Sequence, residues 1–203
     1  GERHGKGEYF NDGLHYDGEW MSGRRAGMGK CTFRNGDLYE GEFQADLMHG
    51  EGVMILANGC RYTGSWVKGK MEGKGQMLLP SGDVYDGEWM AGKKHGAGIY
   101  TAASGSVYEG QFENNKMHGY GKIFFKDGSI YQGNFKNNLR DGTGILRSTD
   151  GGQSWDTTNT GLGQNAVITS VLIADPLTAY AGYYYDDISY GILKSEDAGL
   201  TWF

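Results

Sequence analysis

Proline and cysteine are scarce in this chain, and long apolar runs are absent. The two prolines exclude a collagen-like chain, although 37 of the 203 residues are glycine. The two cysteines, Cys31 and Cys60, are too few for a disulfide framework, so we expect free thiols. No apolar stretch reaches the about 18 residues that a membrane-spanning helix needs. Because hydrophobic residues make up 38% and aromatic residues 13%, disorder is excluded, and we expect a cytoplasmic, glycine-rich β protein.

The charge is distributed unevenly between two parts of the chain. Residues 1–147 contain 18 Lys and Arg and 18 Asp and Glu, whereas residues 148–203 contain one Lys, no Arg and 7 acids, which together give the net charge of -6. This change predicts two segments that meet at residues 147 and 148. Neither segment has a continuous basic face that could neutralise phosphates, so nucleic acid is excluded as a partner.

A motif of the form Tyr-x-Gly-x-Trp/Phe recurs six times with a period of 23 residues. A Gly-x-Gly pair follows each copy, and an Asp-Gly, Asn-Gly or Ser-Gly dipeptide lies between copies. His4-Gly5-Lys6-Gly7 is the second half of an earlier repeat. The aromatic positions, which we expect to be structural, are Tyr16, Trp20, Tyr39, Phe43, Tyr62, Trp66, Tyr85, Trp89, Tyr108, Phe112, Tyr131 and Phe135.

Alternation with a period of two predicts that each half-repeat is a β-strand. The Tyr, Gly and aromatic positions share one face, and acidic residues such as Asp17 and Glu19 occupy the other. We expect the dipeptides, for example Asn35-Gly36, to form two-residue hairpin turns. We also expect aromatic rings to lie over bare glycine backbone on a neighbouring strand. The predicted fold is therefore all-β, an elongated single-layer solenoid of stacked antiparallel hairpins.

Residues 4–147 resemble MORN repeats. The resemblance rests on Tyr-x-Gly-x-Trp/Phe, on His-Gly-x-Gly at His49, His95 and His118, and on the dipeptides between copies. Repeats with Ala26, Glu72 or Asp141 in place of the histidine depart from this pattern. The resemblance implies scaffold and dimerisation roles at cytoskeletal, ciliary and membrane-junction structures, and contact with phospholipids.

The last 56 residues contain a different motif. Ser-x-Asp-x-Gly-x-x-Trp occurs twice and resembles the Asp-box, or BNR, hairpin of β-propellers. Its structural residues are Ser148, Asp150, Gly152, Trp155, Ser195, Asp197, Gly199 and Trp202. Between the copies, residues 167–175, 179–185 and 191–195 are predicted strands. We expect residues 148–203 to resemble one propeller blade that is fused to the repeats or caps them.

No group of residues indicates catalysis, a cofactor or a metal site. The histidines recur at separate repeats and do not converge, and residues 148–203 lack the arginines that sialidase chemistry needs. We therefore expect a protein without enzymatic activity.

Two surfaces are candidates for binding. Basic residues near the hairpin loops predict a stripe along one edge, which suits either anionic lipid or simply solubility: Arg24, Arg25, Lys68, Lys70, Lys93, Lys94, Lys116, Lys136 and Arg140. Apolar residues that alternate away from the glycines predict an exposed row for a partner or a dimer: Met28, Val53, Ile55, Leu78, Ile99 and Phe124. The first hypothesis is a scaffold that binds protein partners or itself through the solenoid surface. The second is a peripheral phospholipid-binding module.

Overall fold

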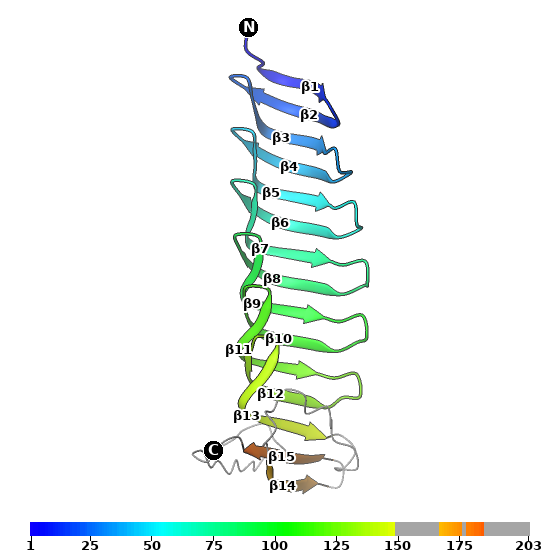
Figure 1. Ribbon diagram of the computed structural model, residues 1–203, viewed down its shortest axis with the longest axis vertical. Coiled ribbons are helices and arrows are strands. Elements are labelled where there is room, and N and C mark those ends of the chain that lie inside the picture. The colour runs from blue at the N-terminus through cyan, green and yellow to red at the C-terminus, as the bar shows by residue number, and fades with distance from the viewer. Residues whose placement is uncertain (149–166, 176–177, 185–203) are drawn as a thin grey trace. The chain divides into compact units, whose positions relative to one another are not determined.

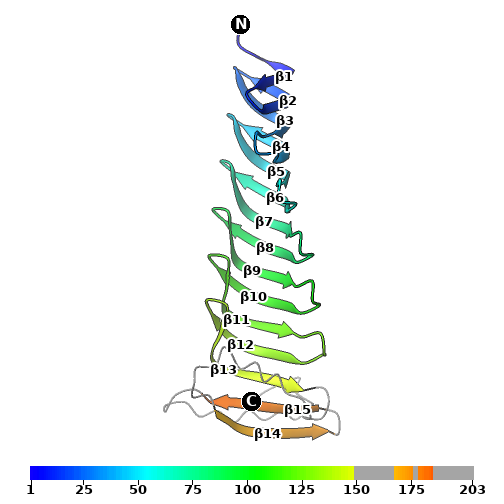
Figure 2. The same ribbon diagram turned by 45° about the vertical axis from the view of Figure 1, so that its right-hand side comes forward.

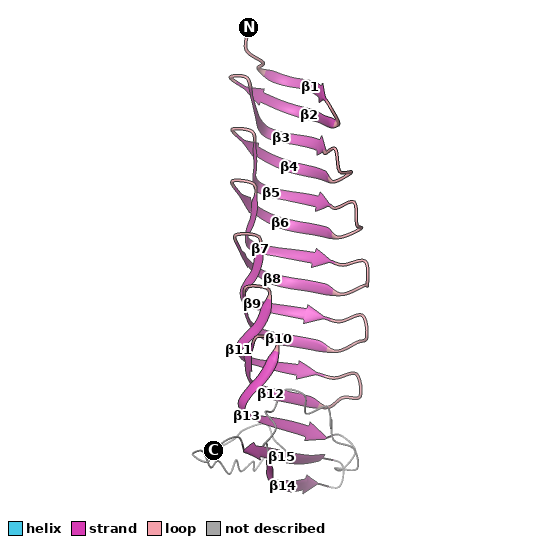
Figure 3. Ribbon diagram, in the orientation of Figure 1, coloured by secondary structure: helices cyan, strands magenta, loops and turns pink. Residues whose placement is uncertain are grey.

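The computed structural model describes residues 1–148, 167–175 and 178–184. Every regular element in these ranges is a β-strand (Figure 3). Within them, no helix is long and apolar enough to cross a membrane. The prediction of an all-β, single-layer repeat fold is confirmed, and the chain divides into two units, residues 1–103 and 104–203.

The first unit is a nine-stranded antiparallel sheet in which each strand pairs with the next along the chain. In Figures 1 and 2 these strands follow one another in chain order. Their bounds are β1 Gly5–Asn11, β2 Leu14–Met21, β3 Arg24–Thr32, β4 Leu38–Gln44, β5 Leu47–Ile55, β6 Arg61–Val67, β7 Lys70–Leu78, β8 Val84–Met90 and β9 Lys93–Thr101.

The second unit is an antiparallel sheet with the strand order β10-β11-β12-β13-β15-β14. Its strands are β10 Val107–Glu113, β11 Lys116–Phe124, β12 Ile130–Lys136, β13 Leu139–Ser148, β14 Val167–Asp175 and β15 Thr178–Tyr184. β14 and β15 confirm two of the three strands predicted after the repeats. The third, residues 191–195, lies outside the described residues. So do all the Asp-box positions except Ser148, which ends β13.

Tight two-residue turns close one side of the hairpins. Both central residues have positive φ, as at Ser22 (48°) and Gly23 (74°) or Asn114 (50°) and Asn115 (71°). Such φ values define the type I′ turn, whose twist matches that of the flanking strands. The second strand of each repeat, for example β3, therefore begins directly after the turn. Few residues remain for the hairpin loop that the sequence predicts at this position.

The turns at the other side are wider than predicted. At Asn35-Gly36, the Phe33 amide donates to Asp37 O (2.8 Å) and the Gly36 amide donates to Phe33 O (2.9 Å), so three residues form the loop. Gly36 has a φ of 88°, which permits this geometry. The same bonds occur around Gly59, Gly82 and Gly128. The prediction of two-residue turns is therefore wrong at these sites and holds at Asp12-Gly13, where Asn11 pairs with Leu14.

Glycines from successive strands form one row across each sheet. In the first unit the paired residues run Gly7, Gly18, Gly29, Gly41, Gly52, Gly64, Gly75, Gly87 and Gly98. In the second unit they are Gly110, Gly121, Gly133 and Gly144. A row without side chains leaves space that a neighbouring ring can fill.

In five repeats the tyrosine ring fills this space within its own repeat; these rings belong to Tyr16, Tyr39, Tyr62, Tyr85 and Tyr108. A Cβ added to Gly29 would lie 2.5 Å from Cε2 of Tyr16, and one added to Gly18 would lie 2.7 Å from its Cζ. The Tyr16 hydroxyl also donates to Glu19 O at 2.8 Å. The prediction that rings pack on bare glycine backbone is confirmed.

The second aromatic position links neighbouring repeats. Trp89 Nε1 donates to Gly75 O at 2.9 Å, in the preceding repeat. The Trp89 ring lies edge-to-face against both Tyr62 and Tyr85, each with a centroid distance of 5.2 Å. Such contacts recur from Tyr16 to Trp89 in the first unit and from Tyr108 to Phe135 in the second. This aromatic ladder forms most of the buried core. Its twelve residues are only 0–7% exposed, which agrees with the structural role predicted for them.

Candidate interaction surfaces

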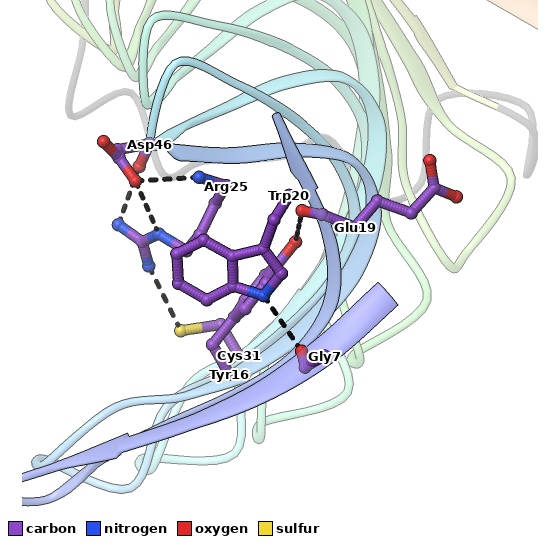
Figure 4. Close-up of polar contacts among 7 residues, drawn as sticks. All are labelled: Gly7, Tyr16, Glu19, Trp20, Arg25, Cys31 and Asp46. Atoms are coloured by element: carbon purple, nitrogen blue, oxygen red, sulfur yellow. Dashed lines mark hydrogen bonds and ion pairs between the residues drawn. The ribbon is translucent and has the colours of Figure 1, made fainter. Parts of the chain in front are cut away.

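Each sheet has two unlike faces. We call the face that carries the aromatic ladder the inner face and the opposite one the outer face. Figure 4 shows the strands curving around Tyr16, Trp20 and Arg25, while the Glu19 side chain lies outside the curve. Because residues opposite one another in an antiparallel pair share a face, the register assigns side chains to each face.

The nine predicted basic residues divide between these faces. Six are exposed at the tight-turn edge, as predicted: Arg24, Lys68, Lys70 and Lys93 in the first unit, and Lys116 and Lys136 in the second. The other three, Arg25, Lys94 and Arg140, are only half exposed and pair with Trp20, Trp89 and Phe135. The prediction of a basic stripe along one edge is therefore wrong for these three, which lie on the inner face. Alternation from the glycine row could have revealed this, since Arg25, Gly27, Gly29 and Cys31 are alternate residues.

Arg25 is held by contacts from a neighbouring repeat (Figure 4). Its Nη2 donates to Asp46 O at 2.7 Å, its Nε lies 3.5 Å from Asp46 Oδ1, and its amide donates to the same oxygen at 2.9 Å. The guanidinium also lies 5.3 Å from the Phe43 ring centroid and 5.7 Å from that of Tyr16. Burial raises the pKa of the neighbouring Cys31 thiol, although Arg25 opposes this rise. The cluster therefore fastens two repeats together and does not activate the thiol.

Lys94 and Arg140 occupy the same repeat position as Arg25. Lys94 Nζ lies 4.9 Å from the Tyr85 centroid and 4.7 Å from that of Tyr100. Burial lowers the pKa of Lys94, and the charge of Asp83 partly opposes this effect. In the second unit, the Arg140 guanidinium lies 4.4 Å from the Tyr131 centroid. Each cation covers the inner side of a ladder tyrosine.

Methionines replace the cations in the two repeats between Arg25 and Lys94. Met48 pairs with Phe43, and Met71 pairs with Trp66, so both lie on the inner face. Met54 and Met77 occupy a second inner position, beside Tyr39 and Tyr62. Met54 is buried, and the other three are half-buried. We call these four residues the methionine floor. They are half of the eight methionines in the chain. The recurrence of methionine at an interval of 23 residues is visible in the sequence, whereas the face that these residues share follows from the strand register.

The tight-turn edge of the first unit combines cations with exposed apolar side chains. Met21 pairs with Arg24, Val67 with Lys70, and Met90 with Lys93. The three apolar members are 60%, 41% and 47% exposed. We call these three pairs the hairpin edge. The sequence revealed its cations, whereas their apolar partners depend on strand register.

The predicted apolar residues lie on the outer face, but they do not form one row. Ile55 and Leu78 both pair with Arg61 and belong to one row. Val53 and Ile99 lie in another, opposite Glu40 and Asp86, and Met28 lies in a third. Phe124 belongs to the second unit and is half-buried. The prediction of a single row is therefore wrong, because alternation fixes a face and not a position along the strand.

Carboxylates dominate the middle of the outer face in the first unit. They are Glu8, Asp17, Glu19, Glu40, Glu42, Glu51, Asp86 and Glu88, and the basic residues among them are Lys6, Lys30 and Lys74. The outer and inner faces thus differ in charge.

The remaining candidates are consistent with structural roles. Cys31 is buried, Cys60 is half-buried, and both are free thiols, as predicted. His118 lies 3.5 Å from Glu113 within one hairpin. Within the described ranges, no three His, Cys, Asp or Glu side chains are grouped so that they could hold a metal ion.

This chain is similar to a solved structure and matches a protein-family model. The SAS-4 (dCPAP) TCP domain of Drosophila melanogaster, solved in complex with a proline-rich motif of Ana2 (dSTIL), matches with 14% identity and a TM-score of 0.44. That match covers 70% of this chain and 82% of that domain. No curated protein matches. The family model for the MORN repeat matches seven times, at residues 1–15, 16–38, 39–61, 62–84, 85–107, 108–130 and 131–153. The matches span most of the sequence, and the chain therefore belongs to the MORN-repeat family.

Proposed function

We propose that this chain is a non-catalytic scaffold that binds protein partners, or a second copy of itself, through the faces of its sheets. The exposed apolar side chains of the outer face carry this proposal. Met28 is 55% exposed, Ile55 42%, Leu78 43% and Ile99 44%. Exposed apolar surface of this kind is a feature of protein-binding sites.

The repeat geometry also supports a scaffold. Two strands per repeat, at about 4.8 Å per strand, place equivalent side chains about 10 Å apart along each unit. A partner that spans several repeats therefore contacts the same backbone geometry in each repeat, but different side chains. Selectivity then depends on the residues that differ between repeats.

Substitutions on the outer face test the scaffold hypothesis. Ile55→Glu combined with Leu78→Glu adds two carboxylates to the apolar row without touching the aromatic ladder. We expect affinity purification with the full chain to recover partners that this variant loses, or light scattering to show self-association that it loses. Thr63→Glu, which adds charge to an exposed polar position on the same face, is the control. Identical partners and identical mass for all three proteins would contradict binding through the outer face.

A second candidate function is contact with an anionic membrane surface through the hairpin edge. The observation that favours it is the direct pairing of exposed Met21, Val67 and Met90 with Arg24, Lys70 and Lys93. Basic residues near a membrane surface each contribute about 1 kcal/mol to binding anionic lipid. Adjacent apolar side chains can enter the interfacial region.

Vesicle sedimentation tests the membrane hypothesis. We expect binding to vesicles that contain phosphatidylserine and none to pure phosphatidylcholine. Lys70→Glu with Lys93→Glu should abolish this binding. Lys30→Glu with Lys74→Glu, which changes the net charge equally in the middle of the outer face, should retain it. Equal loss in both variants would indicate a general charge effect and contradict a specific edge.

We propose a cytoplasmic location at cytoskeletal, ciliary or membrane-associated assemblies, supported by the resemblance to MORN proteins. We also propose that residues 148–203 form an Asp-box hairpin segment, supported by the two copies of Ser-x-Asp-x-Gly-x-x-Trp. Substitution of Asp150 by Ala with a measurement of thermal unfolding tests the second assignment, since the motif needs that carboxylate to accept backbone hydrogen bonds. An unchanged transition would contradict it.

A further inference from the structure

The inner face of the first unit has an apolar centre between two cations. Arg25 in β3 and Lys94 in β9 occupy the same repeat position, and Met48 and Met71 hold that position in the two repeats between them. Met54 and Met77 extend the apolar centre across the strands. This order of charged, apolar, apolar and charged residues is not required by the fold, because the repeat accepts either class.

The methionine floor is built to accept apolar side chains of varied shape. Thioether side chains are flexible and polarisable, and they are frequent at binding surfaces that accommodate different partners. Met48, Met71 and Met77 are only half-buried although they lie beside the buried ring ladder. In the described ranges of the first unit, no second layer of strands or helices covers them.

Charge determines which apolar segment fits. Lys94 and Arg25 bring positive charge to the two ends of the methionine floor, with Asp46 beside Arg25 and Asp83 close enough to act on Lys94. The outer face instead presents eight carboxylates and three lysines in its middle band. A segment with negative charge is therefore repelled by the outer face, whereas on the inner face the two cations and their two carboxylate partners leave no net negative charge to repel it.

The spacing of the cations fixes the length of the partner. β3 and β9 are separated by six strand intervals, which amount to about 29 Å at about 4.8 Å each. A segment that reaches both ends needs about nine residues if extended, or about 19 if helical.

We infer that the inner face binds a peptide segment whose apolar centre covers Met48, Met54, Met71 and Met77 and whose acidic residues lie toward Arg25 and Lys94. The inference rests on the proposed scaffold function and names the chemistry of its partner. Apolar burial supplies most of the affinity, and the cations set the choice of segment and its register.

Selection from a random library tests this chemistry directly. Phage that display random 20-residue peptides are panned on the full chain, with free peptides measured by fluorescence anisotropy. We expect enrichment of apolar peptides that carry Asp or Glu toward both ends. Lys94→Glu should weaken binding of these peptides about tenfold, as the loss of a charge-assisted contact would. Enrichment of Lys and Arg, or no enriched peptide, would overturn the inference.

The methionine methyl groups report the binding site without any substitution. In a spectrum of methyl-labelled methionine, peptide should shift the signals of the methionine floor and leave those of Met21, Met28 and Met90 in place. Met48→Gln with Met71→Gln should lose binding, whereas Ile55→Gln with Leu78→Gln should retain it. The first pair introduces polar side chains at a position that already holds Arg or Lys in other repeats, so the fold should tolerate it. Unchanged thermal unfolding confirms this.

The outcomes separate this inference from the scaffold hypothesis. Peptides that shift Met28, or that are lost with the Ile55 and Leu78 pair, would overturn inner-face binding and leave the scaffold function in place. Vesicles that shift Met21 and Met90 while no peptide binds would overturn the inference and favour the membrane function. If the outer-face and the inner-face variants all keep the same partners as the unaltered chain, the scaffold function itself is contradicted.

Discussion

Substitution of a glycine in the row beneath the tyrosine rings should destabilise the chain strongly. We choose Gly52→Ala because Gly52 does not have positive φ, so backbone strain does not contribute to the result. A Cβ there would lie 2.6 Å from Cε2 and Cζ of Tyr39, whereas ordinary contacts begin at 3.4 Å. The ring would have to move by about 1 Å to reach a normal van der Waals distance.

The expected cost follows from what this movement breaks. Overpacking costs about 1–3 kcal/mol. The hydrogen bond from the Tyr39 hydroxyl to Glu42 O, at 2.9 Å, contributes about 1 kcal/mol. The edge-to-face contacts of Tyr39 with Phe43 and Trp66, at 5.1 and 5.4 Å, contribute about another 1 kcal/mol. We therefore expect Gly52→Ala to lower the free energy of unfolding by about 4 kcal/mol.

Gly7→Ala is the matched control. Gly7 lies in the same row, but a Cβ there would lie 3.7 Å from Cδ1 and Nε1 of Trp20, an ordinary contact. Gly7→Ala should change the free energy of unfolding by less than about 1 kcal/mol, since alanine lowers the conformational entropy of the unfolded chain and so offsets a small loss of packing. Urea unfolding followed by tryptophan fluorescence measures both variants, with the slope against urea checked for constancy. Equal stability of the two variants would refute the argument that the rings occupy the space above the glycines.

Three further predictions concern the ladder, the tyrosines and the wide loops. Trp89→Phe should lower the free energy of unfolding by only about 1 kcal/mol, because it removes the hydrogen bond to Gly75 O but keeps an aromatic ring, as at Phe43. Trp89→Ala should lower it by about 3–5 kcal/mol, and urea unfolding distinguishes the two variants. Burial raises the pKa of Tyr16 and of Tyr108 from 10.0 to about 12, so the stability should be constant up to pH 10 and fall as pH rises toward 12; an unchanged urea midpoint up to pH 12 would contradict this. Hydrogen bonds from the Ala103 amide, and then from Tyr100 and Ser81, lower the pKa of Asp83 below 3.8. The stability that this carboxylate provides should therefore persist above pH 3.8 and be lost as pH falls through the lowered pKa, and thermal unfolding of Asp83→Asn should lack this component.

The repeat, the strand class and the composition of the core can all be predicted from the amino-acid sequence. These properties depend on local periodicity: alternation places Tyr16, Gly18 and Trp20 on one face whatever the rest of the chain does. The packing of rings on glycine also follows, since only residues without side chains leave room for a buried ring. The strands β14 and β15 were predictable for the same reason, from short apolar runs bounded by polar residues.

Which residues meet across strands depends on the folded chain. The two-residue turn at Ser22-Gly23 starts β3 at Arg24, so Arg24 pairs with Met21 at the exposed edge and Arg25 pairs with Trp20 of the ladder. The pairing of Met21 with Arg24, and the assembly of four methionines on one face, likewise require the register between strands. Register depends on turn geometry and on the irregular pairing after each glycine, which involve contacts between distant residues and leave no signal in any single stretch of sequence.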